Sequence, residues 1–211
     1  MSQRENIIEH AMNMFVSQGI KAVRMDDIAR ELSISKRTLY ELFGDKEELL
    51  YQSIICFTRM GNEKRQEQIK HIDNRLEVMI FALRDMITQT PIASRLRRNM
   101  QRFYPSVYKR LEDDLTAQHR ENMRMWIKHC VKDGYLTATA DSDYVLKILI
   151  DSTQGIMYAD SFDVHETQEM VAYISYAIVI FIRGLCTPKG IEVIDSTFDK
   201  YFGNIQVSST L

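Results

Sequence analysis

Apolar residues recur at helical spacing along almost the whole chain, and the alternation typical of strands is nearly absent. Eight Gly and three Pro interrupt the 211 residues, so few positions force the backbone out of a helix. The pattern therefore predicts an all-α protein. The predicted helices cover residues 2–18, 25–32, 36–43, 46–61, 74–88, a segment that begins at Pro91, 105–134, 141–162, 166–185 and a short tail at 191–202.

Residues that favour helix ends bound the N-terminal helices. Ser2 and Glu5 have the spacing of a capping box, and Gly19 can adopt the positive φ that ends the first helix. Asp45 and Glu48 have the spacing of a second capping box at the start of the fourth helix. These signals predict three short helices followed at once by a longer one.

The predicted helices become longer after about residue 50. The short helices supply an apolar face that includes Leu39 and Phe43, enough for a small three-helix core. We therefore expect two domains: a helix-turn-helix head at residues 1–48, with the motif itself at about 25–43, and a larger helical domain at residues 49–211.

Charge limits how the head could bind nucleic acid. The whole chain carries a net charge of -2, and its isoelectric point is about 6.2. Residues 1–50 hold nine acidic side chains against seven Lys and Arg. Any DNA contact must therefore come from locally placed cations and not from bulk attraction.

Other bulk features indicate a cytoplasmic protein. The three cysteines, Cys56, Cys130 and Cys186, lack CxxC spacing and fit free thiols in a reduced compartment. No signal peptide opens the chain, and the strongest apolar run, at residues 177–182, is too short to span a bilayer. We therefore expect no membrane partner.

The second helix of the predicted motif carries side chains suited to DNA. A helix-turn-helix reads the major groove with the first residues of this helix, which here are Lys36, Arg37 and Thr38. Lys and Arg can donate to guanine, and Thr offers a hydroxyl and a methyl group. Tyr40 lies one turn further on, and Lys46 lies in the first turn of the next helix, where both can reach phosphates.

These residues, with their neighbours, resemble the DNA-binding domain of TetR-family transcriptional regulators over residues 4–50. The resemblance rests on Gly19, MDDIA at 25–29, Ile34-Ser35, Thr38-Leu39-Tyr40, Phe43 and DKEEL at 45–49. Two positions depart from the family pattern. Ser33 stands where the turn usually has Gly, and Arg24 stands where the family often has a Thr or Ser cap. With Arg24 at this position the helix at 25–32 loses its side-chain cap, but the guanidinium could add a phosphate contact, as could Lys21.

The resemblance implies that the larger domain forms a homodimer on a palindromic operator in double-stranded DNA and binds a small-molecule effector. The dimer helices would present Val145, Ile148, Ser152, Gly155 and Ala159 on one helix, and Val171, Ile174, Ala177, Ile178 and Phe181 on the next. Both stripes could instead face the core of the monomer. The expected function is a repressor that its effector releases from DNA. A transcriptional activator, or a helical small-molecule-binding protein with a non-functional head, remain alternatives.

An effector pocket is predicted where large apolar side chains share helix faces. The candidate lining is Met86, Phe103, Tyr104, Tyr108, Met123, Trp126 and Cys130. Ordinary core packing is the alternative for each of them. Residues 94–111 also hold six Lys and Arg and no acid. Their stripe of Arg95, Arg98 and Arg102 is either a solvated surface or a clamp for an anionic effector.

Motifs for catalysis or cofactor binding are missing from the sequence. There is no Gly-rich phosphate loop, and the five His lack metal-ligand spacing with Cys or acids. Ser33-x-x-Lys36 matches a nucleophile motif only formally, because it straddles the turn of the helix-turn-helix. We therefore expect no enzyme activity, no cofactor and no metal.

Overall fold

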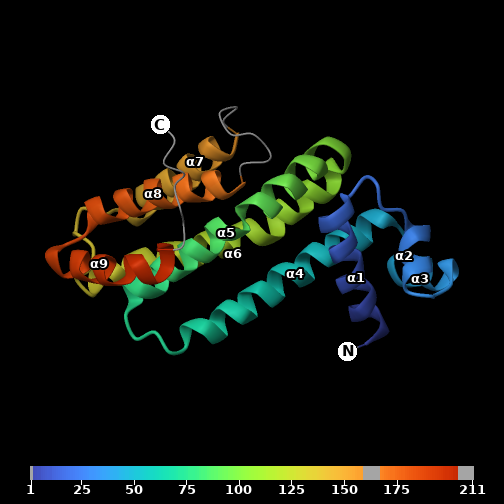
Figure 1. The fold of residues 1–211 in the computed structure, drawn as a ribbon, viewed down its shortest axis with the longest axis horizontal. Coiled ribbons are helices and arrows are strands. Elements are labelled where there is room, and N and C mark those ends of the chain that lie inside the picture. Colours follow the sequence, from blue (N-terminus) through green and yellow to red (C-terminus); the bar gives the residue numbers. More distant parts are fainter. Residues whose placement is uncertain (1, 159–166, 204–211) are drawn as a thin grey trace. The chain divides into compact units, whose positions relative to one another are not determined.

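The computed structural model describes residues 2–158 and 167–203, and within these ranges the chain is helical (Figure 1). The described helices are α1 (Gln3–Gln18), α2 (Met25–Glu31), α3 (Lys36–Phe43), α4 (Lys46–Ile69), α5 (Arg75–Phe103), α6 (Pro105–Lys132), α7 (Ser142–Tyr158), α8 (Thr167–Leu185) and α9 (Pro188–Phe202). The predicted all-α fold is confirmed. None of the described helices is both long and apolar enough to cross a membrane.

The capping signals at the first helix act as predicted. The hydroxyl of Ser2 accepts the N–H of Glu5, and the Glu5 carboxylate accepts the N–H of Ser2 at 2.7 Å. These hydrogen bonds hold the pKa of Glu5 below its usual value. Gly19 ends α1 with a φ of +90°, a conformation that costs a glycine little.

Contacts divide the chain into two compact units. The first contains residues 1–68 and 92–116, and the second contains residues 69–91 and 117–211. Helices α5 and α6 therefore contribute to both units. Helix α4 belongs to the first unit together with α1–α3. This division by contacts does not test the predicted domain boundary at residue 48, which stays a prediction.

The core of the first unit joins the three short helices to α4 and to parts of α5 and α6. Phe15 from α1, Ile28 from α2, Leu39 from α3 and Leu49 from α4 are fully buried in it. Each such side chain contributes roughly 1.5–3 kcal/mol through burial. This core fixes the position of α3 on α1, α2 and α4.

Helix α5 corrects the prediction of two helices separated near Pro91. Proline inside a helix removes one hydrogen bond and costs about 3 kcal/mol. Ile87 on one side of Pro91 is buried in the second unit, and Leu96 and Met100 on the other side are buried in the first. Burial on both sides, at roughly 1.5–3 kcal/mol for each side chain, outweighs the local cost.

Helix α4 also extends further than predicted. The sequence suggested an end near Gly61, whereas the helix continues to Ile69. A single glycine inside a helix costs only about 1 kcal/mol relative to alanine, and the residues that follow are mostly good helix formers. The predicted break was therefore too weak to end the helix.

The core of the second unit decides between the two interpretations of the helix stripes on α7 and α8. Val145 on α7 and Ile174 and Ile178 on α8 are buried within the chain itself. Ile148 is exposed, and Ala159 lies outside the described residues. Most of the described apolar members of the stripes therefore pack in the monomer.

Candidate nucleic-acid interface

A tight turn holds α2 and α3 in a helix-turn-helix arrangement. Ser33 adopts the left-handed conformation, with φ of +52°, and the N–H of Ile34 donates to the carbonyl of Ala29 at 3.0 Å. Ser35 then caps α3, because its hydroxyl accepts the N–H of Thr38 at 3.0 Å. The replacement of glycine by Ser33 is therefore tolerated at a cost of about 1 kcal/mol.

Helix α3 buries one face and exposes the other. Leu39 and Phe43 pack in the core of the first unit. Lys36, Arg37 and Tyr40 are exposed on the helix. The helix therefore presents its first turn to the surroundings, as a recognition helix requires.

The candidate base-contacting side chains have partners within the chain. The ammonium of Lys36 pairs with Asp26, and Arg37 pairs with Glu41 at 2.7 Å. The hydroxyl of Thr38 lies 2.8 Å from that of Ser35. Exposed ion pairs of this kind contribute little, at about 0–1 kcal/mol, so DNA can exchange them for its own contacts.

Lys46 and Arg24 lie at the edges of the motif. The ammonium of Lys46 donates to the carbonyl of Ile20 at 2.5 Å and lies 5.3 Å from the centroid of the Tyr104 ring. The side chain of Arg24 forms no cap, and Asp27 instead accepts the Arg24 N–H at 3.1 Å. The exposed guanidinium of Arg24 therefore stays available for an anion.

The predicted second capping box forms only in part. Asp45 accepts the N–H of Glu48 at 2.8 Å, but the Glu48 carboxylate accepts hydrogen bonds from Gln52 and Arg110, both at 2.6 Å. These bonds, the one from Gln52 first, lower the pKa of Glu48. Arg110, a residue distant in sequence, draws the carboxylate away from the backbone.

A cluster of polar side chains ties the beginning of α4 to α6. Arg110 lies over the ring of Tyr51, 3.4 Å from its centroid, and pairs with Glu48. The Tyr51 hydroxyl donates to Asp114 at 2.6 Å, and this hydrogen bond raises the pKa of Tyr51. The helix that follows the recognition helix is thus anchored by several contacts at once.

The seven candidate pocket residues belong to two different units, and the effector pocket that they would line stays a prediction. Phe103, Tyr104 and Tyr108 belong to the first unit, where Tyr108 accepts from Arg97 and donates to Glu112. The others belong to the second unit and pack in or against its core: Met86, Met123, Trp126 and Cys130. Burial raises the pKa of the Cys130 thiol to about 12. The predicted lining is thus divided between the two units.

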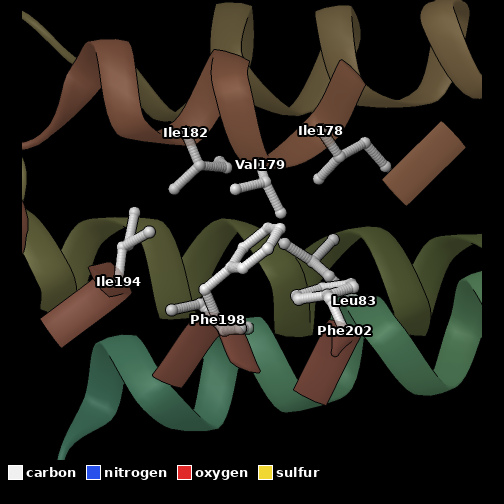
Figure 2. Close-up of a pocket in the computed structure, with 8 residues that line it drawn as sticks. Leu83, Ile178, Val179, Ile182, Ile194, Phe198 and Phe202 are labelled. Atoms are coloured by element: carbon white, nitrogen blue, oxygen red, sulfur yellow. The ribbon is translucent and has the colours of Figure 1, made fainter. Parts of the chain in front are cut away.

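A small cavity lies elsewhere in the second unit, among α5, α8 and α9 (Figure 2). Its volume is about 10 Å³, room for one water-sized molecule. The lining is entirely apolar: Ile80, Leu83, Ile178, Val179, Ile182, Ile194, Phe198 and Phe202. Helical spacing at 191–202 predicts only a short tail helix, and this does not indicate a cavity wall. The spacing of Ile194, Phe198 and Phe202 was the available signal.

The arginine stripe lies in the first unit. The guanidinium of Arg95 donates to the carbonyl of Val16 in α1, whereas Arg98 and Arg102 are exposed. None of the three lines the apolar cavity.

Comparisons with known proteins identify the same motif. The family model described as "Bacterial regulatory proteins, tetR family" matches residues 7–52. The HTH-type transcriptional repressor KstR2 of Mycolicibacterium smegmatis is 25% identical over 160 residues, which cover 72% of this chain and 76% of KstR2. IcaR of Staphylococcus aureus, a negative regulator of the biofilm operon icaADBC, is 24% identical over 52% of this chain. That match spans 62% of IcaR, less than two thirds of its length.

A solved structure supports the fold over most of the chain. A transcriptional regulator from Cytophaga hutchinsonii superimposes with a TM-score of 0.73 at 15% identity, covering 87% of this chain and 98% of its own. The family consists of regulators and not of enzymes. The exposed recognition helix, the family match over residues 7–52 and the shared fold agree, and the chain carries the DNA-binding domain of TetR-family transcriptional regulators.

Proposed function

We propose that this protein is a homodimeric repressor that binds a palindromic operator and is released by a small apolar effector. The observation that carries the proposal is the presentation of α3, whose Leu39 and Phe43 are buried while Lys36, Arg37 and Tyr40 are exposed. The relatives KstR2 and IcaR are a repressor and a negative regulator, which supports repression as the outcome of binding.

The proposed contacts divide into base-reading and phosphate-holding residues. Lys36, Arg37 and Thr38 would reach base edges from the first turn of α3. The remaining contacts, which set the register of the protein on the duplex, would come from Tyr40, Lys46 and Arg24.

Substitution of one residue from each group tests this division. Lys36→Ala should relax the preference at one base pair of each half-site, at a cost of about 1–3 kcal/mol in discrimination. Lys46→Ala should weaken binding to all sequences alike and reduce its salt dependence. Binding by the wild type and both variants would be measured on a duplex selected from a random-sequence library and on its scrambled version. If neither substitution changed binding, α3 would not be the recognition helix; sequence-independent binding by the wild type would exclude a sequence-specific regulator.

The proposed dimer uses an exposed apolar face of the second unit. Helices α7 and α8 contact each other (Figure 1). Tyr144 and Ile148 are exposed one turn apart on α7, and Tyr173, Tyr176 and Ile180 are exposed at helical spacing on α8. Large apolar side chains in such an array favour burial against a second copy, which would bring two α3 helices to one operator.

The proposed effector is apolar because the cavity among α5, α8 and α9 offers no polar group to a ligand. A charged group placed there would lose its hydration without compensation. The cavity holds only one water-sized molecule, so a larger ligand can enter only if side chains of its wall move. A ligand that favours the state unable to bind DNA by a few kcal/mol is enough to release the operator.

A pair of probes with equal chain length tests the chemical class of effector. Decanol should raise the unfolding temperature and weaken operator binding, whereas decanoate should do so only at much higher concentration, because its carboxylate must be desolvated. Thermal unfolding and fluorescence anisotropy would measure the two effects. Val179→Trp, which fills the cavity from α8, should remove the response to decanol. Equal responses to decanoate and decanol would contradict the apolar site.

A further inference from the structure

Three cations of the first unit that have no acidic partner among the described residues lie outside the recognition helix but contact one small group of aromatic residues. Lys36 and Arg37 on α3 each pair with an acid. By contrast, no ion pair joins Lys21, Lys46 or Arg102 to any residue in the described part of the chain. The two cations at the start of α3 are therefore paired with acids, whereas these three cations outside the helix are not.

Two adjacent aromatic rings hold these three cations. The ammonium of Lys21 lies 4.6 Å from the centroid of the Phe103 ring, and the guanidinium carbon of Arg102 lies 5.1 Å from it. The ammonium of Lys46 lies 5.3 Å from the ring of Tyr104. Phe103 ends α5 and Tyr104 leads into α6, so both rings come from the junction of these helices.

The contacts link these residues to one another. Lys46 donates to the carbonyl of Ile20, which precedes Lys21 in the chain. The ammonium of Lys21 lies over the ring of Phe103, and the ammonium of Lys46 lies over the ring of Tyr104, the next residue. We call Lys21, Lys46, Arg102, Phe103 and Tyr104 the junction cluster. It combines residues from the α1–α2 turn, the first residue of α4 and the α5–α6 junction.

The chemistry of the junction cluster is that of an anion site. An aromatic face orients a cation without cancelling its charge, and a single backbone carbonyl does the same. A carboxylate in the same place would neutralise the cation. The nearby acid Glu47 is itself engaged, since it accepts the hydroxyl of Ser106 at 2.6 Å. The cluster therefore keeps three positive charges oriented and available.

We propose that the junction cluster is a second DNA-contact site, which binds backbone phosphate outside the bases that α3 reads. Lys46 follows the end of α3 by three residues, so the cluster and the recognition helix can reach the same duplex. The proposal rests on the proposed function for the phosphate contact of Lys46. It adds Lys21 and Arg102 as ligands, and it assigns Phe103 and Tyr104 as positioning residues.

Salt dependence distinguishes a phosphate contact from a structural role. Each phosphate contact contributes about 0.9 to the slope of log affinity against log salt, which corresponds to about eightfold in affinity at 0.1 M salt. Arg102→Ala should therefore weaken binding about eightfold for each bound protomer and lower the slope by about 0.9 for each. The loss should be equal on the selected and the scrambled duplex, because phosphates carry no base identity.

Conservative and distant substitutions provide the controls. Arg102→Lys keeps the charge and should retain most of the slope, and Phe103→Leu keeps the apolar volume but should weaken binding because it removes the aromatic face. Lys64→Ala on α4 removes the same charge about 27 Å along the helix from Lys46 and should change neither affinity nor slope. Circular dichroism of each variant would verify that the helices are intact.

The duplex itself can identify the phosphate. Neutral methylphosphonates would replace the backbone phosphates of the selected duplex one at a time. In each half-site, one of these replacements should weaken binding by the wild type. The same replacement should not weaken binding by Arg102→Ala, which no longer makes that phosphate contact. The proposal would be overturned if Arg102→Ala had the same salt slope as the wild type and lost as much affinity as the wild type at every replaced phosphate. That outcome would leave sequence-specific binding by the wild type intact, whereas loss of wild-type specificity would overturn the proposed function instead.

Discussion

Replacing Ile180 by glutamate should convert the proposed dimer to a monomer and weaken operator binding at least about 100-fold. Ile180 is 67% exposed on α8, on the same face as Tyr173 and Tyr176. In a two-fold interface, each substitution occurs twice, and burying the two unpaired carboxylates costs several kcal/mol. A monomer binds only one half-site and loses the gain of roughly 10²–10⁴ that linked sites provide.

Light scattering coupled to gel filtration would give the mass of the variant, and anisotropy would give its affinity for the selected duplex. The fold should persist, because an exposed side chain contributes little to the core. Met60→Glu adds the same charge at an exposed apolar residue of α4, outside α7 and α8, and should change neither mass nor affinity. If Ile180→Glu remained dimeric, the interface would lie on another face of the chain.

The best predicted features depend on local hydrogen bonds. The cap at Ser2, the cap at Ser35 and the bounds of α3 follow from residues within four positions of each other. Such hydrogen bonds join residues close in the sequence and do not depend on distant parts of the chain, so the sequence contains nearly all of the information needed to predict them. The exposure of Lys36 and Arg37 follows from the same helix, once Leu39 and Phe43 define its buried face.

The features that sequence reasoning missed depend on residues far apart in the chain. Pro91 was expected to separate two helices, but the apolar residues on both sides of it are buried, which keeps α5 continuous. Glu48 was expected to complete a capping box, but Arg110, 62 residues away, takes its carboxylate. Spacing within one helix could not reveal either partner.

The effector site illustrates the same limit. Helical spacing identifies a face of a helix but not the face that it packs against, so the sequence alone cannot tell whether Phe103 and Trp126, which belong to different units, line one pocket. Phe103 contacts the cations Lys21 and Arg102 through its ring.

Replacing Gly190 by alanine should destabilise the protein by about 3 kcal/mol, a larger effect than at any other glycine for which the structure describes the surroundings. A Cβ atom at Gly190 would lie 2.1 Å from the carbonyl oxygen of Tyr135 and 3.1 Å from Cβ and Sγ of Cys186. The carbonyl is backbone and already accepts the N–H of Thr187 at 3.0 Å, so it cannot move without breaking that bond. Overpacking of this kind costs about 1–3 kcal/mol or more.

The matched control is Gly61→Ala in the interior of α4, where a Cβ would meet nothing within 4 Å. Alanine there should stabilise the helix by up to about 1 kcal/mol, because it restricts the unfolded chain and removes no contact. For a chain of this size, 1 kcal/mol corresponds to about 2–4 °C in unfolding temperature. Calorimetry should therefore show the two substitutions moving the transition in opposite directions. If Gly190→Ala lowered the unfolding temperature by no more than Gly61→Ala changes it, the start of α9 would be able to move away from Tyr135 at little cost. The close contact with Tyr135 would then not hold this helix in place.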